Sequence, residues 1–394
     1  MIAKIERGVL VIVLVLLSSC KDKVKESAPT SKTEPVSMLK TSLKASDFIG
    51  KIENDSVGFY TITNDNGIEV SFSNFGQRII ALQVPDKSGK FEDIVLGYAT
   101  VDEFVNNRNY YGSVIGRYGN RIAKGQFKIG DTTYDLAKNN GENHLHGGVK
   151  GFESVVWNVD GVSGSEISFS RLSPDMEEGY PGNLMVKVHY SLNNQNELRI
   201  RYEATTDKPT VVNLTNHSFF NLKGEGNGDI LNHIVMINAD GYTPVDSGLI
   251  PTGKIENVSG NPFDFREAKT IGKEIDSDFG QIKIGNGYDH NYVLNETPKN
   301  SVGLKLAAKV EEPESGRTLE VYTSEPGVQF YTGNFMDGSD IGKTGKPYVF
   351  RGSFCFETQH YPDSPNQPSF PSTLLNPGET YETTTIYKFG VVKN

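Results

Sequence analysis

Residues 184–206 read LMVKVHYSLNNQNELRIRYEATT, and apolar side chains alternate with polar ones along both halves of this stretch. An alternation of period two is typical of strands that bury one face of a sheet. The run Asn-Asn-Gln-Asn at 193–196 separates the halves and is typical of a turn. The stretch therefore predicts two strands separated by a turn.

The same alternation recurs along the chain, for example in GIEVSFSNFG (67–76), LKLAAKV (304–310) and TLEVYTS (318–324). Helical periodicity is scarce, and only residues 101–107 favour one short helix. We find neither an internal linker nor a repeat of fixed period. The pattern predicts an all-β protein, a sandwich or a barrel, and we expect one extended sandwich over residues 47–394 whose polar motifs converge on one groove.

The composition is that of a soluble globular protein, with 22% charged and 36% hydrophobic residues among 394. The formal charge is −10 and the pI is about 5.3. Nucleic-acid binding requires a basic surface, so a nucleic-acid partner is not expected. A neutral small-molecule partner is compatible with this charge.

The amino terminus has the features of an export signal. Lys4 and Arg7 precede an apolar run at 8–17 that is too short to span a bilayer, and Leu-Ser-Ser-Cys closes it at Cys20. This order resembles a bacterial lipoprotein signal, which implies that residues 1–19 are removed and that Cys20 is acylated. The alternative is an ordinary secretory signal with an incidental cysteine.

Residues 20–46 are rich in Lys, Ser, Thr, Glu and Pro, which predicts a flexible tether between the acylated cysteine and the domain. Several acyl chains on Cys20 would hold the protein at a membrane of the cell envelope without a transmembrane helix. The other cysteine, Cys355, then has no intramolecular partner, so no disulfide is expected.

Chemistry-bearing side chains are gathered in a few short motifs: GRYGNRI (116–122), NHLHGG (143–148), NLTNHSFFNL (213–222), GYDHNY (287–292), PGVQFYTGN (326–334) and SFCFETQ (353–359). In the last motif, Cys355, Glu357 and Gln359 share one strand face, and the two phenylalanines share the other. A glutamate on an apolar strand is costly to bury as a charge, so it is either paired or functional.

The histidines admit more than one interpretation. His217 alone would fit a hydrogen-bonded core histidine. The pair His144 and His146 has a spacing that could hold a metal, but no thiolate or carboxylate shell accompanies it. No metal site is therefore predicted. Cys355 has no adjacent base and is interpreted as a packed side chain.

The order of these motifs resembles the aldose 1-epimerase (galactose mutarotase) family, from about Phe59 to Val391. The segment FCFETQHYPDSPNQPSFPSTLLNPGETY (354–381) extends the match almost to the carboxyl terminus. The resemblance implies the family's large antiparallel β-supersandwich. It also implies an isomerase that interconverts the α and β anomers of free aldohexoses such as galactose and glucose, with neither metal nor cofactor.

The resemblance also implies roles for particular residues. Glu357 would be the general base and His217, as an imidazolium, the general acid. Sugar hydroxyls would be bound by five residues, namely Asn120, Arg121, His146, Asp289 and Gln329. Phe219 departs from the family pattern, which commonly has tyrosine there, and this puts one hydrogen bond and the substrate preference in question.

Two other functions stay open. A glycoside hydrolase would use Asp289 and Glu357 as paired carboxylates around a glycosidic bond. A non-catalytic sugar-binding lipoprotein would keep the aromatic side chains and Arg121 but would not need Glu357 together with His217. The preferred aldose, the membrane face and the oligomeric state are not indicated by the sequence.

Overall fold

The two predicted strands are present in the computed structural model as β14 (Leu184–Leu192) and β15 (Glu197–Thr206), which form a hairpin. The strands pair antiparallel along their length, and buried positions alternate with exposed or half-buried ones. In the turn, Oδ1 of Asn193 accepts the backbone N–H groups of Gln195 (2.9 Å) and Glu197 (3.0 Å). The asparagine side chain thus fixes the turn that the sequence predicts.

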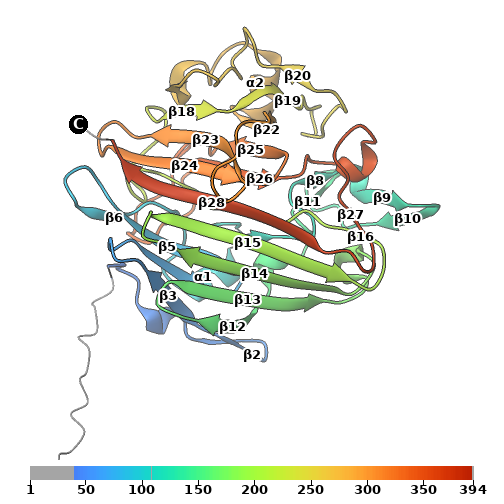
Figure 1. The fold of residues 1–394 in the computed structure, drawn as a ribbon, viewed down its shortest axis with the longest axis horizontal. Helices are drawn as coiled ribbons and strands as arrows, with labels where there is room; N and C mark the ends of the chain where they lie inside the picture. The colour runs from blue at the N-terminus through green and yellow to red at the C-terminus, as the bar shows by residue number, and fades with distance from the viewer. Residues whose placement is uncertain (1–39, 108, 393–394) are drawn as a thin grey trace, which may run out of the picture. The chain divides into compact units, whose positions relative to one another are not determined.

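This hairpin belongs to a nine-stranded sheet in the order β12-β13-β14-β15-β28-β24-β23-β18-β21 (Figure 1). Its other strands are Asn158–Val162 (β12), Glu166–Ser173 (β13), Ile234–Ile237 (β18), Lys269–Thr270 (β21), Lys305–Glu311 (β23), Arg317–Thr323 (β24) and Tyr381–Val391 (β28). The long strand β28 lies between β15 and β24, so it joins segments that are far apart in the sequence.

A five-stranded sheet, in the order β20-β19-β22-β25-β26, carries much of the chemistry described below. Its strands are Ala239–Tyr242 (β19), Glu256–Asn257 (β20), Asp289–Leu294 (β22), Gly327–Tyr331 (β25) and Cys355–Gln359 (β26). A four-stranded sheet consists of Phe59–Thr63 (β3), Glu69–Ser73 (β4), Arg78–Pro85 (β5) and Phe91–Asp93 (β6). All these strand pairs are antiparallel, which confirms the predicted fold class.

The remaining strands form short pairs: Gly50–Ile52 (β1) with Asp55–Val57 (β2), Val114–Ile115 (β7) with Thr215–Asn216 (β17), Arg121–Ile122 (β8) with His144–Leu145 (β11), Gln126–Ile129 (β9) with Thr132–Asp135 (β10), and Thr210–Val211 (β16) with Leu374–Leu375 (β27). The helices are Val101–Asn106 (α1) and Gly280–Gly285 (α2), with 3₁₀ turns at Ala45–Phe48, Ala123–Gly125, Phe152–Ser154, Glu177–Gly179, Ile271–Lys273 and Ser364–Asn366. The helix predicted at 101–107 is α1, and Thr100 and Glu103 form its capping box.

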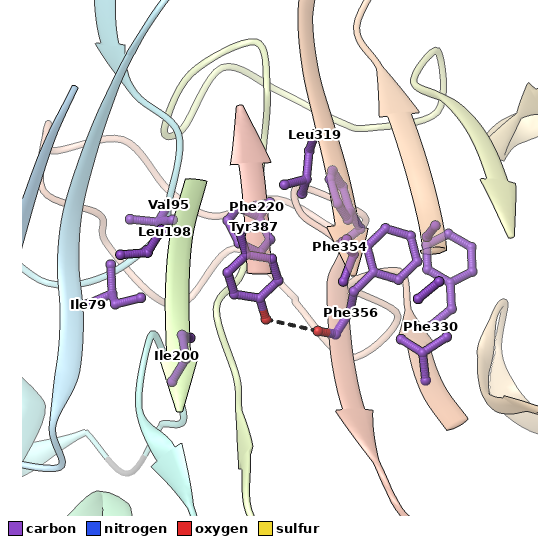
Figure 2. Packing of buried hydrophobic residues seen from close by; sticks show 14 of the residues in the cluster. Ile79, Val95, Leu198, Ile200, Phe220, Leu319, Phe330, Phe354, Phe356 and Tyr387 are labelled. Atoms are coloured by element: carbon purple, nitrogen blue, oxygen red, sulfur yellow. Dashed lines mark hydrogen bonds between the residues drawn. The ribbon is translucent and has the colours of Figure 1, made fainter. Parts of the chain in front are cut away.

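Aromatic side chains fill the core behind β25 and β26. Figure 2 shows Phe330 of β25, Phe356 of β26, Phe354 directly before β26, and Tyr387 of β28. The Phe330 and Phe356 rings stack with centroids 5.0 Å apart, and the Tyr387 hydroxyl donates to the Phe356 carbonyl oxygen (3.1 Å). Burying each ring stabilises the fold by roughly 1.5–3 kcal/mol. The apolar face of β26 is thus committed to the core, and its polar face carries Glu357.

The structure describes residues 40–107 and 109–392. The predicted signal at 1–19, Cys20 and the tether as far as residue 39 lie outside these residues. Within them, no helix is long and apolar enough to cross a bilayer.

The domain begins before the predicted boundary at Asp47. The Glu69 carboxylate accepts the backbone N–H groups of Lys40 and Thr41 at 2.9–3.0 Å, and Leu43 packs in a hydrophobic cluster that also contains Phe48. Residues 40–46 therefore pack on the domain rather than forming part of the tether. Their polar composition did not reveal this, because the contacts are made mainly by backbone groups.

Candidate active site

The predicted polar residues converge on one pocket of about 340 Å³. Six of them line it, namely Asn120, Arg121, His146, His217, Asp289 and Glu357. The seventh, Gln329, donates from Nε2 to Asp289 Oδ1 at 2.7 Å. Residues separated by more than 230 positions in the chain are thus brought to one site.

Glu357 lies in the middle of β26 and is 2% exposed. It pairs with Gln329 of β25, which places both side chains on the pocket side of the five-stranded sheet. Burial raises the pKa of Glu357 well above its usual range, and the neighbouring Asp289 raises it further, while Arg121 opposes both effects. The surroundings therefore favour the protonated form of the carboxyl group.

His217 follows β17, where its backbone N–H donates to the Ser113 carbonyl oxygen at 2.9 Å. Its ring lies against Phe219 (centroids 4.7 Å apart, interplanar angle 18°) and Tyr110 (5.7 Å, 20°). Its Nε2 is 3.5 Å from Glu357 Oε1. The backbone contact and the two rings fix the imidazole next to the carboxyl group.

Burial lowers the pKa of His217 to about 3, so the imidazole is neutral near pH 7. This differs from the imidazolium expected from the sequence. The physical reason is desolvation, because His217 is 5% exposed and its closest neighbours include aromatic rings. Hydrophobic enclosure of this kind depends on residues distant in the sequence.

His146 comes from the tight turn after β11. The turn needs glycine at the next position, because Gly147 has φ +83° and a Cβ there would lie 1.8 Å from the Gly116 carbonyl oxygen. The backbone N–H of Asn120 donates to His146 Nδ1 (3.1 Å), and the His146 N–H donates back to the Asn120 carbonyl oxygen (3.1 Å). The Nδ1 lone pair is thus used, so the neutral ring carries its hydrogen on Nε2. His146 can therefore act as a hydrogen-bond donor.

Arg121 and Asp289 form the charged part of the pocket. Nη1 of Arg121 is 3.9 Å from Asp289 Oδ2, and its Nε donates to Asn140 Oδ1 at 3.2 Å. Burial raises the pKa of Asp289, whereas Arg121 and the Gln329 amide lower it. The net effect is a raised pKa, and the guanidinium and the amide hold the Asp289 oxygens in one orientation at the pocket.

The structure clarifies the metal question raised by the histidine pair. His144 lies away from the pocket, with Nδ1 2.8 Å from the Ala137 carbonyl oxygen and Nε2 2.7 Å from the Tyr180 hydroxyl. The only group of potential metal ligands among residues 40–107 and 109–392 is instead His146, His217 and Glu357, whose ligand atoms lie within 4.8 Å of one another. Coordination through His146 Nε2 would move its hydrogen to Nδ1, where it would face the Asn120 N–H. The donor set therefore fits a metal poorly.

Several pocket residues were missed by the sequence motifs. Tyr110, Tyr111, Phe335 and Asp340 all line the pocket. The Asp340 carboxylate accepts the Tyr98 and Tyr111 hydroxyls (2.5 and 2.8 Å) and the Asn109 amide (2.8 Å). These contacts hold the 333–352 segment at the pocket rim. The only sequence signal was the pair of tyrosines before Gly112, which lies outside any strand pattern.

Phe219 forms an apolar wall of the pocket. Its ring stacks on His217 and meets Tyr111 edge-on, with centroids 4.7 Å apart in each case. Cys355 is buried, and burial raises the pKa of its thiol well above the usual range. Phe219 therefore shapes the pocket, and Cys355 packs in a hydrophobic cluster beside it.

Comparisons with known proteins agree with this geometry. A family model described as aldose 1-epimerase matches residues 58–388. Galactose mutarotase of Bos taurus is 48% identical over 324 residues, covering 82% of this chain and 92% of that protein. Aldose 1-epimerase of Escherichia coli (strain K12) is 38% identical over 331 residues, covering 84% and 94%.

Solved structures show the same similarity. An aldose epimerase homologue from C. elegans has a TM-score of 0.78 and 31% identity, covering 86% of this chain and 100% of that one. Galactose 1-epimerase from Lactobacillus acidophilus NCFM has a TM-score of 0.76 and 30% identity, covering 87% and 97%.

Proposed function

Because this chain belongs to the aldose 1-epimerase family, we propose that its pocket interconverts the α and β anomers of free aldohexoses, with Glu357 and His217 as the acid–base pair. The observation that carries the proposal is the contact between the two, His217 Nε2 to Glu357 Oε1 at 3.5 Å, at the pocket surface. One residue of the pair can accept a proton while the other donates one.

The reaction needs two proton transfers and no redox change. Glu357 removes the proton of the C1 hydroxyl as His217 protonates the ring oxygen, the bond between C1 and the ring oxygen breaks, and an aldehyde forms. Rotation about C1–C2 presents the other face of the carbonyl, and the two residues exchange roles as the ring closes. Each positioned group contributes on the order of 10²- to 10⁴-fold to the rate.

The protonation states of the free site are compatible with this assignment. When Glu357 is a neutral carboxyl group and His217 a neutral imidazole, the pair holds one titrating proton. The pair holds the same number when Glu357 is a carboxylate and His217 an imidazolium. Moving the proton from Glu357 to His217 therefore prepares the base and the acid together, without exchange with solvent. The two groups titrate as one coupled system.

Sugar hydroxyls are bound by the surrounding polar groups. Arg121 supplies guanidinium donors, Asp289 supplies acceptor oxygens, and His146 supplies an Nε2–H donor. Asn120 and Gln329 fix two of these groups through the hydrogen bonds described above. Arg121 and His146 also stabilise charge that develops on the ring oxygen.

The hydrolase alternative is less well supported. Asp289 would have to act as the second carboxylate, but its two oxygens face the Gln329 amide and the Arg121 guanidinium.

Polarimetry with fresh α-galactose, α-glucose and α-xylose tests the function directly. An enzyme-dependent acceleration supports the proposal. Release of reducing ends from oligosaccharides would favour a hydrolase, and sugar binding without either activity would favour a binding protein.

We also propose that the chain is a lipoprotein anchored to a membrane of the cell envelope through Cys20. The charged start, the short apolar run and the Leu-Ser-Ser-Cys sequence support this. The anchor would hold the catalytic domain near the membrane, where exported or incoming sugars pass. The anchoring does not enter the chemistry of the pocket.

A further inference from the structure

A second group of polar side chains lies on the same sheet face as Glu357, away from the lining of the pocket. Asn291 of β22, Gln329 of β25 and Glu357 of β26 are paired directly across the three strands. Gln359 follows Glu357 by two positions, so its side chain leaves the same face. All four residues are at most 3% exposed. The carboxyl group thus stands in a buried row of amides.

Much of this row has no hydrogen-bond partner among the described residues. Both amide atoms of Asn291, both amide atoms of Gln359, Oε1 of Gln329 and Oε2 of Glu357 are unpartnered. An unpaired buried polar group is destabilising, and proteins satisfy such groups with ordered internal water. Six such atoms on neighbouring residues form a polar environment suited to water.

Gly327 makes room for the amides. It pairs with Gln359, and a Cβ at this position would lie 2.5 Å from Asn291 Oδ1. The Asn291 amide therefore extends over the glycine toward the position of Gln359. A larger residue at 327 would occupy the space that the Asn291 amide uses.

We propose that Asn291 and Gln359 bind internal water and, through it, act as positioning residues for Glu357. The water would accept from an amide N–H and donate to Glu357 Oε2, leaving Oε1 toward His217 and the substrate. This rests on the proposed role of Glu357 as the base. Asparagine and glutamine do not titrate, so they act by stabilising one protonation state of Glu357.

The sign of the effect follows from hydrogen bonding. A donor to the carboxylate favours the ionised form, so the bound water lowers the proton affinity of Glu357. Other groups that face or influence the carboxyl are His146, His217, Asp289, Arg121, Tyr331, Tyr387 and Cys355. These groups are unchanged when an amide is replaced. Loss of the water site should therefore raise the pKa of Glu357 above its value in the unmodified protein.

The test uses Gln359→Leu and Asn291→Leu, which keep approximate size but remove the hydrogen-bonding atoms. Thr358→Val is the matched control, because Thr358 is a buried polar residue on the same strand with its side chain on the other face, bonded to Thr385. In both leucine variants, the alkaline limb of the pH profile of kcat/KM should move to higher pH by about one unit. The shift corresponds to a tenfold change in proton affinity. Thr358→Val should leave the limb in place.

Two measurements do not depend on turnover. Titration of the ¹³C-labelled Glu357 carboxyl should show the same upward shift in the leucine variants. A high-resolution crystal structure of the unmodified protein should show ordered water within hydrogen-bond distance of Glu357 Oε2 and of Gln359 or Asn291. Unshifted titrations in both variants, or no such water, would overturn the proposal. An inactive protein that still shows the water and the shift would instead count against the proposed function.

Discussion

His217 Nε2 lies 3.5 Å from Glu357 Oε1, and the two side chains respond to the same enclosure in opposite directions. Burial lowers the pKa of the imidazole to about 3 and raises that of the carboxyl. Each shift disfavours a charged form. In the proposed mechanism, ring opening begins when a proton moves from Glu357 to the imidazole and the carboxylate becomes the base.

Replacing Glu357 by glutamine should abolish most of the turnover. The amide keeps the shape of the side chain but cannot accept the C1 proton, so kcat should fall on the order of 10²- to 10⁴-fold while much of the sugar affinity remains. Polarimetry gives the rate, and calorimetric titration with galactose gives the affinity. Glu69→Gln is the control, because Glu69 is also buried but bonds to Lys40 and Thr41 outside the pocket. A Glu357→Gln enzyme with near-normal turnover would exclude Glu357 as the base.

The pair of Glu357 and His217 should hold its proton on the carboxyl group rather than on the imidazole. His217 should stay neutral as the pH falls to about 4 and protonate only near its lowered pKa of about 3. Activity is then lost at low pH, when His217 binds a proton in addition to the one on Glu357. It is lost at high pH when Glu357 releases its proton and the pair holds none. The alkaline limb of kcat/KM thus belongs to Glu357, whose pKa is raised. Titration of the ¹⁵N-labelled imidazole checks this, and a His217 midpoint near 6.5 would contradict it.

Turnover should not depend on a metal. The Asn120 N–H occupies the Nδ1 lone pair of His146, which leaves a hydrogen rather than a lone pair on Nε2. Prolonged dialysis against a chelator should therefore leave kcat unchanged, with elemental analysis as the accompanying measurement. Stoichiometric zinc whose removal abolishes activity would show that this tautomer is wrong.

Asn213 should prove important for assembly of the site. Its Oδ1 accepts the His360 N–H (3.0 Å), and its Nδ2 donates to the carbonyl oxygens of Gly119 and His360 (3.2 Å each). The side chain thus ties the loop of Asn120 to the strand of Glu357. Asn213→Ala should lower the free energy of unfolding by about 2–4 kcal/mol, since three buried groups lose their partner. Urea denaturation measures this, and a change below about 0.5 kcal/mol would argue against such a role.

Cys20→Ala should release the protein from the membrane. Without the acylated cysteine the export signal has no lipid attachment point, so the variant should move from the detergent phase to the aqueous phase in phase partitioning. The pocket is unaffected, so the released variant should keep its mutarotase rate. Unchanged partitioning of the variant would refute the lipoprotein assignment.

The sequence by itself determined the strands and the faces of the important ones. Alternation in 184–206 is a local property, set by which side chains can face a core, and it predicted β14 and β15 correctly. The same period of two separated Glu357 from Phe354 and Phe356, whose rings pack in the core (Figure 2), while Glu357 lines the pocket. The order of the motifs along the chain was enough to suggest the family. That order can be read from the sequence without knowing which residues contact one another.

Only the tertiary structure decided the chemical state of the site. The pKa of His217 depends on enclosure by side chains such as Tyr110, which lies more than 100 positions away, and the tautomer of His146 depends on a backbone N–H from another loop. The unpartnered amides of Asn291 and Gln359 could not be recognised from spacing either, because hydrogen-bond satisfaction is known only once every neighbour is placed. Periodicity reports which face a side chain takes, whereas desolvation and hydrogen bonding are set by long-range packing.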